Sequence, residues 1–535
     1  MTSQTQSAAA STGHRFASRA ARAVFALAVL LLLGACGALP RPVERPVSHA
    51  MASAPQDSAL ARLVAAQMPP GASSAFRLLP LGSYALDARL ALIRHATRSI
   101  DLQVYIMDND ESGRAVFAAL RDAARRGVRV RLLLDDLNTT GAEPLIEALL
   151  AQPNMEIRLF NPFCCVRGSF AGRILSSLGE LPRLDHRMHN KLMIADGVLA
   201  LVGGRNVADE YFGLNTNANF IDLDALAAGN VVPQLAAIFD RYWNSDDAFP
   251  ARAVIGPPKP DAAATAEALL PPSAAHLALA LPPRDLLGRG PVGAQLDEGR
   301  LSLLPAVAYA VADRPDKRRE TAEELQNASL MTGAESNILG TRSEIALVSP
   351  YLVPGKQGMA VLHSLQRKGV ENTVVTNSLG ANDSTVVYLG YARYRRPMLQ
   401  AGVKLYEVSA APSAARGTVF GGSSRGRLHA KLVVIDRQTT LIGSLNMDPR
   451  SARKNTEVGV AIDSEAIAAE ALLLVESMKA EAYQVRLGHE GGGALNWQRP
   501  GEDEDAAPLP GEPGFSAFQA LQELLLQPLV PEDQL

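Results

Sequence analysis

The chain has 535 residues, of which 47% are apolar and 20% are charged, and its formal net charge is −3 at pH 7. This composition is that of a globular protein with enough apolar material for one large domain or two ordinary ones, and it excludes the disordered and fibrous classes. The slightly acidic balance gives no overall attraction for nucleic acid, so we expect no nucleic-acid partner.

The first 36 residues are typical of a secreted lipoprotein. Three arginines, Arg15, Arg19 and Arg22, precede an apolar run over residues 23–33. This run is shorter than the roughly 20 residues that a bilayer span needs. This layout predicts a signal peptide over residues 1–35. The run ends in Leu-Gly-Ala-Cys, which resembles a bacterial lipobox and implies lipidation of Cys36 after the leader is removed.

These features also predict the location of the protein. We expect an extracytoplasmic lipoprotein, anchored to a membrane on the periplasmic side. Gly37 after Cys36 is not the aspartate associated with inner-membrane retention in enteric bacteria, which slightly favours the outer membrane. The alternative is an uncleaved N-terminal anchor, which would also hold the protein at a membrane surface.

The chain then repeats one order of elements twice. Residues 99–107 predict a strand, 111–127 a helix that ends at a glycine, and 128–136 a second strand; residues 343–353, 358–369 and 370–378 repeat this order. Each repeat closes with a helix, over 232–243 and 466–482. Strands that alternate with helices indicate parallel β-α-β units and a layered α/β fold.

The repeat suggests a division of the chain into consecutive regions. We expect a Pro- and Ala-rich tether between the anchor and the body, two similar halves, an insert between the halves and a C-terminal tail. The expected bounds are 36–77 for the tether, 78–250 and 338–485 for the halves, 251–337 for the insert and 486–535 for the tail. Within the tail, the apolar spacing of residues 515–529 predicts a helix that docks on the body.

Each half carries the same string, His-x-Lys-x4-Asp-x6-Gly-x2-Asn. The first copy starts at His189 and the second at His429. One His-x-Lys pair has no predictive value, but two copies of five fixed positions, in register with a repeated fold, exclude coincidence. The remaining positions are Lys191, Asp196, Gly203 and Asn206 in the first copy, and Lys431, Asp436, Gly443 and Asn446 in the second.

The residue types in the string predict a site for a phosphate group. On a strand, positions i and i+2 share one face, so each histidine would lie beside its lysine. The asparagines add amide donors, and two lysines give the site an excess of positive charge, which suits a phosphate. Asp196 and Asp436 lie seven residues after their histidines, an odd offset that turns them away, so we interpret both as structural carboxylates.

The two strings are the HKD motif, and the chain resembles the phospholipase D superfamily from about Leu78 to Tyr483. The stretches MHNKLMIADGVLALVGGRNVADEYF and TNSLGANDSTVVYLGYARYRRPML, and the terminal VPEDQL, are similar to bacterial cardiolipin synthases of the C type. One departure is Gly204, where serine is usual in the superfamily, whereas Ser444 keeps the hydroxyl.

The resemblance implies two α/β/α sandwich halves related by a pseudo-twofold axis, with one phosphodiester bound between His189 and His429. It implies that one histidine attacks phosphorus and forms a phosphatidyl-histidine, and that the other protonates the leaving alkoxide. By analogy with the family, His189 is the nucleophile and His429 is the acid/base. Lys191, Lys431 and the two asparagines, with Ser444, would hold the phosphoryl oxygens, so that no metal or other cofactor is needed.

Each histidine needs a partner that orients its ring. The candidates follow the motifs at matching places: Asp222 or Asp224 in the first half, and Glu457 in the second. We favour Asp224, because Asp224 and Glu457 each open a strand-like run, and we therefore count both as catalytic. The alternative is that these are solvated carboxylates at strand ends.

The function that the sequence favours is cardiolipin synthesis, by transfer of a phosphatidyl group to phosphatidylglycerol. The expected partners are phospholipids, with phosphatidylglycerol or phosphatidylethanolamine as the donor, together with the membrane surface, and we expect a monomer. Hydrolysis of phospholipids to phosphatidic acid is the alternative. An extracytoplasmic nuclease is disfavoured by the acidic charge and the anchor, and an inactive lipid-binding lipoprotein by the two intact motifs.

The cysteines predict little beyond lipidation. Cys164 and Cys165 are neighbours, and neighbouring cysteines rarely form an unstrained disulfide. We expect them to be small apolar filler, and their number and spacing predict no metal site and no redox pair.

Overall fold

The computed structural model describes residues 39, 43–51, 58–270, 279, 281–321, 324, 329–410, 425–488, 494–500, 502, 507–509 and 511–514. The predicted signal peptide, Cys36 and the predicted C-terminal helix over 515–529 lie outside the described residues. Their assignments therefore stay predictions.

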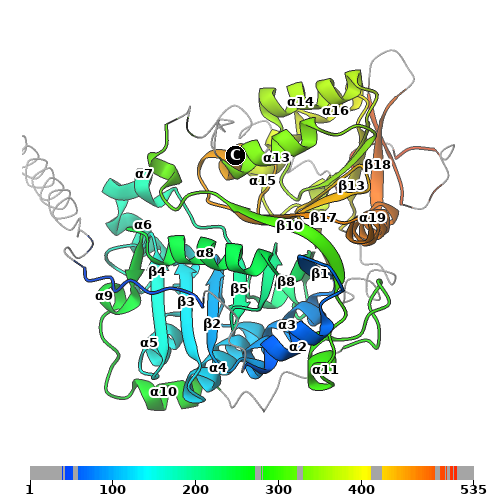
Figure 1. Ribbon diagram of the computed structural model, residues 1–535. Helices are drawn as coiled ribbons and strands as arrows, with labels where there is room; N and C mark the ends of the chain where they lie inside the picture. Colours follow the sequence, from blue (N-terminus) through cyan, green and yellow to red (C-terminus); the bar gives the residue numbers. More distant parts are fainter. Residues whose placement is uncertain are drawn as a thin grey trace, which may run out of the picture.

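The first half is built on a mixed sheet in which three neighbouring strands are parallel, as expected from β-α-β units. From one edge to the other, its strands are β1 (Ser74–Leu79), β8 (Asp224–Gly229), β6 (Leu199–Gly203), β5 (Leu192–Ala195), β2 (Ser99–Val104), β3 (Arg129–Asp135), β4 (Met155–Phe160) and β9 (Ala248–Pro250). One face is covered by α3 (Gly82–His95), α4 (Glu111–Arg125) and α5 (Glu143–Leu150), and the other by α8 (Val231–Trp243) (Figure 1).

The second half repeats this order strand by strand. Its sheet runs β10 (Leu304–Ala312), β17 (Val458–Asp463), β16 (Thr439–Gly443), β15 (Leu432–Ile435), β11 (Glu344–Val348), β12 (Glu371–Asn377), β13 (Lys404–Val408), β18 (Ala482–Leu487) and β19 (Leu495–Gln498). Here α13 (Leu330–Leu339), α14 (Gly355–Arg367) and α16 (Arg395–Gln400) cover one face, and α19 (Glu465–Ala480) covers the other. The repeated order confirms the predicted fold of two related α/β halves.

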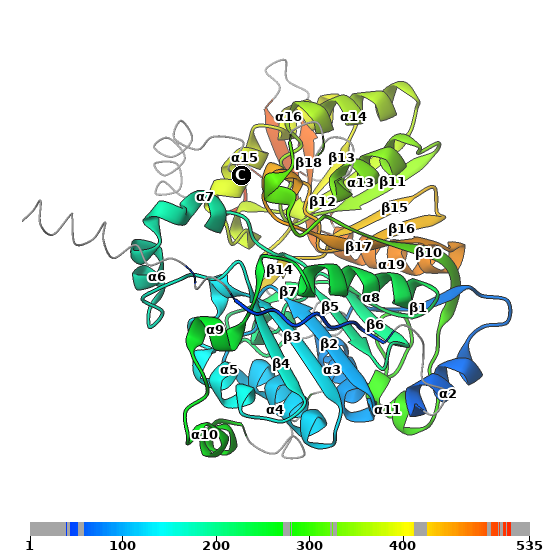
Figure 2. The ribbon, with the colours of Figure 1, turned by 60° about the vertical axis from the view of Figure 1, so that its left-hand side comes forward.

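Strand β10 joins the two sheets into one. Its residues 304–306 pair with β1, and its residues 307–312 pair with β17. All the described strands except β7 and β14, which form a separate two-stranded sheet, therefore belong to one continuous seventeen-stranded sheet. Helices α8 and α19 lie in the shared core between the halves, where α19 contacts β1 and α8 contacts β10 (Figures 1 and 2). This common core fixes the two halves relative to each other.

The structure changes three of the predicted boundaries. Helix α2 (Ala59–Gln67) and most of β1 fall in the predicted tether over 36–77, so the folded body begins earlier. The predicted insert over 251–337 contains β10 and nearly all of α13, which correspond to β1 and α3 of the first half. The predicted tail over 486–535 contains β19, which extends the second sheet. Pro- and Ala-rich composition hid these elements, because β10 reads LPAVAYAVA.

Shorter helices connect the main elements. They are α6 (Phe170–Ser176), α7 (Leu181–Leu184), α9 (Ala251–Ile255), α10 (Ala262–Leu269), α11 (Val292–Asp297), α15 (Thr385–Ala392) and α18 (Pro449–Arg453). Within the described residues, no helix combines the length and the apolar character that a membrane span requires.

Candidate active site

A pair of parallel strands carries one histidine of the site to a carboxylate of the other half. Strand β7 (Ala218–Ile221) of the first half pairs with β14 (Arg425–Leu428) of the second, with Ile221 opposite Leu428. The next residues along the two strands are Asp222 and His429. The His429 amide donates to the Ile221 carbonyl at 2.7 Å, and its ring Nδ1 donates to Asp222 Oδ2 at 2.6 Å.

The same arrangement, with the roles of the two halves exchanged, holds the other histidine. Met188 and Thr456 form a parallel bridge between the halves, and the next residues are His189 and Glu457. The His189 amide donates to the Thr456 carbonyl at 2.9 Å, and His189 Nδ1 donates to Glu457 Oε2, also at 2.9 Å. Each half therefore supplies one imidazole and the carboxylate that orients the imidazole of the other half.

The prediction that Asp224 orients a histidine is wrong, because Asp222 is the residue at His429. Asp224 Oδ2 instead accepts from Arg89 Nη1 at 2.9 Å in a buried ion pair. The strand register gives the reason. Gly203 lies opposite Asp224, whereas Gly443 of the second motif lies opposite Gly459, so the true counterparts, two residues earlier, are Asp222 and Glu457.

The prediction that each histidine and its lysine lie on a strand is also modified. Strands β5 and β15 begin at Leu192 and Leu432, one residue after each lysine. The histidines lie in the extended segments just before, where their backbones bond to the other half. The sequence of one half alone cannot show these backbone bonds, because the segment of the other half that accepts them is more than 200 residues away.

Both histidines are buried and uncharged near neutral pH. Burial lowers the pKa of His189 to about 4, although Glu457 acts in the opposite direction. Burial, Lys431 and Lys191 lower the pKa of His429 well below its usual value. Aromatic rings contribute to this burial: Tyr105 meets the His189 ring edge to face at 5.1 Å, and Tyr211 and Phe220 contact the His429 ring.

The pKa values of the two carboxylates that orient the histidines are shifted in opposite directions. Burial alone would raise the pKa of Glu457, but His189, Lys191 and the Ser444 hydroxyl together hold it below its usual value. Burial raises the pKa of Asp222, and this outweighs the effect of Lys431. Glu457 is therefore the more firmly ionised of the two.

The motif lysines point back toward their own histidines. Lys191 Nζ donates to the His189 carbonyl at 2.7 Å, and Lys431 Nζ lies 3.2 Å from His429 Nε2. Burial lowers the pKa of Lys191 to about 7, against the effect of Glu457, and that of Lys431 to about 8, against Asp222. The two ammonium groups lie in a nearly closed site, where an anion would recover the electrostatic energy that their burial costs.

Gly204, where serine is usual, is explained by the carboxylate beside it. A Cβ atom at this position would collide with the carboxylate of Asp222. In the second half, the Ser444 hydroxyl donates to Glu457 and accepts from the Val458 amide at 3.0 Å. The shorter aspartate side chain brings its carboxylate close to the backbone and leaves no space for a side chain at 204.

The motif asparagines are not equivalent. Asn206 Oδ1 accepts from the Ile106 amide at 3.2 Å and its Nδ2 donates to the Tyr211 hydroxyl at 2.7 Å, so its side chain is engaged within the first half. Asn446 is buried, and its Oδ1 has no hydrogen-bond partner. Of the two, Asn446 has an amide oxygen that remains available to accept a hydrogen bond from a ligand, such as one from a hydroxyl group.

The motif aspartates lie at the opposite ends of β5 and β15 from the histidines. Asp196 accepts from the backbone amides of residues 97–99, and Asp436 from those of residues 342–344. Both adopt a φ near +50° in the turn after the strand. Each carboxylate therefore fixes the start of the neighbouring strand, β2 or β11, and contacts neither histidine.

The structure adds two acidic residues that the motif did not identify. Asp383 accepts from the Tyr351 hydroxyl at 2.8 Å and acts electrostatically on His429 and Lys431. Asp448 caps α18 through the Ser451 amide, and burial raises its pKa to about 7. Asp448 stands two residues after Asn446, so proximity to the motif was a usable signal, whereas Asp383 comes from a distant loop.

The cysteine pair differs from its prediction. Cys164 and Cys165 are joined in a disulfide, and both are half-buried rather than core residues, so the expectation of apolar filler is wrong. The described part of the chain contains no cluster of three or more His, Cys, Asp or Glu side chains that could hold a metal ion.

Comparisons with known proteins agree on one family. A family model described as "Cardiolipin synthase, PLD-like domain" matches residues 90–243 and 335–478, one match in each half. The chain is 41% identical over 423 residues to "Cardiolipin synthase C" of Escherichia coli (strain K12), across 77% of this chain and 86% of that protein. It is 28% identical over 422 residues to a "Cardiolipin synthase" of Geobacillus kaustophilus, across 78% of this chain and 68% of that protein.

A solved structure shares the fold. The phosphatidylserine synthase of Haemophilus influenzae Rd KW20 aligns with a TM-score of 0.56 and 13% identity, over 86% of this chain and 95% of that one. The family itself is shown by the two matches to the family model and by the relative at 41% identity. The chain belongs to the phospholipase D superfamily and, within it, to the cardiolipin synthases, which are phospholipase D-type phosphatidyltransferases.

Proposed function

We propose that this protein synthesises cardiolipin by moving a phosphatidyl group from one phosphatidylglycerol to the free hydroxyl of another, through a phosphohistidine intermediate. The observation that supports this most strongly is the crossed arrangement of the two buried histidines, each held by a carboxylate of the other half. Two oriented imidazoles at one site are what a double displacement at phosphorus needs, since one forms a bond to phosphorus and the other moves protons.

In the first step, His189 Nε2 attacks the phosphorus of the donor lipid. Binding of the anionic phosphodiester beside His429 favours the protonated ring, which takes up a proton on Nε2. A P–N bond forms, the P–O bond to the glycerol headgroup breaks, and the glycerol oxygen takes this Nε2 proton from His429. In the second step, His429 removes the proton from the acceptor hydroxyl, whose oxygen attacks phosphorus as the P–N bond breaks. His189 is then free again, and the product carries two phosphatidyl groups on one glycerol.

The choice of His189 as nucleophile rests on the charge of its partner. Glu457 stays ionised, and a carboxylate on Nδ1–H raises the basicity of Nε2 and stabilises the positive charge that the ring gains when the P–N bond forms. Asp222, with its raised pKa, gives His429 less of this stabilisation. Asp222 orients His429, and the Ser444 hydroxyl orients Glu457. Lys191 and Lys431 attract the phosphoryl oxygens, and Asn446 Oδ1 accepts from a hydroxyl of the lipid.

Membrane tethering is part of the proposal. The leader that ends in Cys36 would confine the enzyme and its diacyl substrates to one surface. A group of large apolar side chains around α6 and α7 supports contact with lipid, because five of them are between 42% and 63% exposed within 16 residues. They are Val166, Phe170, Leu175, Leu178 and Leu181. Cys36→Ser should release the protein from the membrane fraction.

Product analysis tests this function. Purified protein is incubated with labelled phosphatidylglycerol, with and without phosphatidylethanolamine, and labelled cardiolipin and phosphatidic acid are counted. We expect cardiolipin to be the main product, and His429→Ala to abolish it. Phosphatidic acid as the main product would replace transfer by hydrolysis, and plasmid cleavage that His429→Ala abolishes would indicate a nuclease instead.

A further inference from the structure

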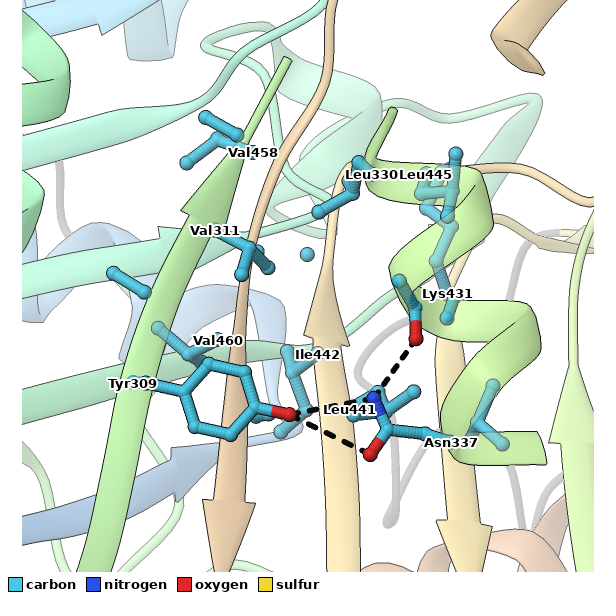
Figure 3. Close-up of a pocket in the computed structure, with 18 of the residues that line it drawn as sticks. Tyr309, Val311, Leu330, Asn337, Lys431, Leu441, Ile442, Leu445, Val458 and Val460 are labelled. Atoms are coloured by element: carbon cyan, nitrogen blue, oxygen red, sulfur yellow. Dashed lines mark hydrogen bonds between the residues drawn. The ribbon is translucent and has the colours of Figure 1, made fainter. Parts of the chain in front are cut away.

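Two apolar cavities flank helix α13 in the second half. The first, the sheet cavity, lies between α13 and the strands β10, β16 and β17 (Figure 3) and measures about 620 Å³. The second, the helix cavity, lies between α13, α14 and β11 and measures about 660 Å³. Apolar side chains dominate both linings: Val311, Leu441 and Val460 in the sheet cavity, and Leu347, Leu362 and Val374 in the helix cavity.

The sheet cavity reaches the motif residue Lys431, and the helix cavity reaches the segment that follows the second motif. Met447, which follows the motif residue Asn446, lines each of them. The sheet cavity is also lined by Lys431 and by Val458, the neighbour of Glu457, and the helix cavity by Asp448. The apolar space therefore begins beside the groups that are proposed to hold the phosphate, and continues from there along both sides of α13.

The corresponding helix of the first half is packed differently. In α3, Leu86, Leu92 and Ile93 have no exposed surface, and most of the helix is buried with them. In α13 only three side chains are buried, and each keeps between 6% and 9% of its surface exposed: Leu330, Ala334 and Ile338. Protein interiors are normally close-packed, so the space beside α13 is a departure from the packing of the corresponding helix in the first half.

Two of the polar residues that line the sheet cavity, Asn337 and Tyr309, bond to each other. Asn337 Nδ2 donates to the Gly333 carbonyl at 2.9 Å and to the Tyr309 hydroxyl at 3.3 Å (Figure 3). The hydrogen-bonding groups of Asn337 and Tyr309 are therefore paired within the protein. Tyr309 is 46% exposed, so this pair lies where the cavity meets the surface. The other walls are mainly apolar, and volumes of roughly 300–1,000 Å³ with mainly apolar linings and a few polar groups are typical of ligand pockets.

We infer that the two cavities bind the acyl chains of the phospholipid whose phosphate lies between His189 and His429, with one chain on each side of α13. The ligand class is a long-chain diacyl glycerophospholipid, and the inference rests on the proposed function. Its support is that Lys431 lines the sheet cavity, Asp448 lines the helix cavity and Met447 lines both, together with the apolar walls of the two cavities. Burial of methylene groups in these spaces would favour long chains over short ones.

Gly333 offers a direct test of the sheet cavity. It lines this cavity, and a Cβ atom added there would have no atom within 4 Å, so a larger side chain can enter the space without displacing backbone. Gly333→Leu fills part of the cavity, and Gly333→Ala adds only a methyl group. Leu339→Phe, on the same helix and 39% exposed outside both cavities, is the matched control for a large side chain on α13.

The variants are compared on two substrates, dioleoyl phosphatidylglycerol in mixed micelles and water-soluble dibutyryl phosphatidylglycerol. Gly333→Leu should lower kcat/KM for the dioleoyl lipid at least about tenfold, the cost of losing burial of roughly two methylene groups, and leave kcat/KM for the dibutyryl lipid within about twofold. Gly333→Ala and Leu339→Phe should change neither value by more than about twofold. Equal losses on both substrates, or no loss with Gly333→Leu, would overturn the inference.

A binding measurement separates this inference from the proposed function. The inactive His429→Ala variant of the full chain is irradiated with phosphatidylglycerol that carries a diazirine at the end of one acyl chain, and the labelled peptides are identified. Labelling of residues 304–312 or 330–365 is expected. Labelling elsewhere, or labelling there only after residues 515–535 are removed, would overturn the acyl site, since the apolar tail would then be its occupant. If the His429→Ala variant is labelled as expected but the unmodified enzyme makes no cardiolipin, the proposed function is refuted and the acyl site is not.

Discussion

Glu457 accepts the hydrogen bond of His189 across the boundary between the two halves, at 2.9 Å, and both residues are buried. The same relationship joins His429 to Asp222 in the opposite direction. Neither half alone contains an oriented histidine. The site is therefore complete only when the two halves pack together through the shared core, and this accounts for one chain that carries both copies of the motif.

The first prediction concerns Glu457. Glu457→Gln keeps the size of the side chain but removes the charge that raises the basicity of His189, so we expect turnover to fall at least about tenfold, the usual cost of losing an orienting partner. Steady-state kinetics with labelled phosphatidylglycerol measure this. A Glu457→Gln enzyme with unchanged kcat would remove this carboxylate from the mechanism.

The two aspartates before and at the start of β8 should separate catalysis from stability. Asp222→Asn should lower turnover, because it weakens the orientation of His429. Asp224→Asn breaks the buried pair with Arg89 and should lower the free energy of unfolding by about 3–5 kcal/mol, with kcat of the folded fraction retained. Thermal unfolding and kinetics on both variants check this, and the reverse pattern would restore Asp224 as the orienting residue.

Gly204 should not tolerate the serine that is usual at its position. The new side chain would collide with the Asp222 carboxylate and push it away from His429, so Gly204→Ser should lose more activity than Ser444→Gly, which removes a hydroxyl without a collision. Activity is measured beside circular dichroism to confirm that both variants fold. Near-normal activity of Gly204→Ser would show that Asp222 can move without consequence.

Lipid binding should weaken as the pH rises through the pKa values of the two motif lysines, about 7 and about 8. Below these values both are ammonium ions that attract the phosphate, and above them they are neutral, so KM should increase. Lys431→Arg keeps the charge and should flatten the upper part of this dependence. A KM that is constant over this range would contradict the assigned pKa values.

Stability of the unliganded protein should change in the opposite sense over the same range. Lys191 has lost its proton in the folded state above a pKa of about 7, whereas the unfolded chain keeps it up to 10.5. The unfolded state thus binds more protons, and the free energy of unfolding rises with pH in this window. Denaturant titrations at several pH values test the sign, and they also show that an increase in KM does not come from unfolding.

The sequence predicted the parts of this protein that depend on local order. The repeated strands and helices, for example α4 and α8, agree with their periodicity, and the spacing of the two motifs identified the lysines and histidines that the structure brings together. It failed at β10, whose alanines and proline resemble a linker, since its strand conformation depends on pairing with β1 and β17. It also failed at Asp222, because the choice between 222 and 224 depends on a strand register that only the pairing with β6 and β14 sets.

The central claim is tested most directly by locating the covalent intermediate. The enzyme is mixed with phosphatidylglycerol labelled in its phosphate, quenched in alkali during turnover, digested, and analysed by mass spectrometry. We expect the labelled phosphoglycerol group, which the alkali has freed of its acyl esters, on His189, with a lower occupancy in Glu457→Gln. Label on His429, or turnover without label on either histidine, would contradict it.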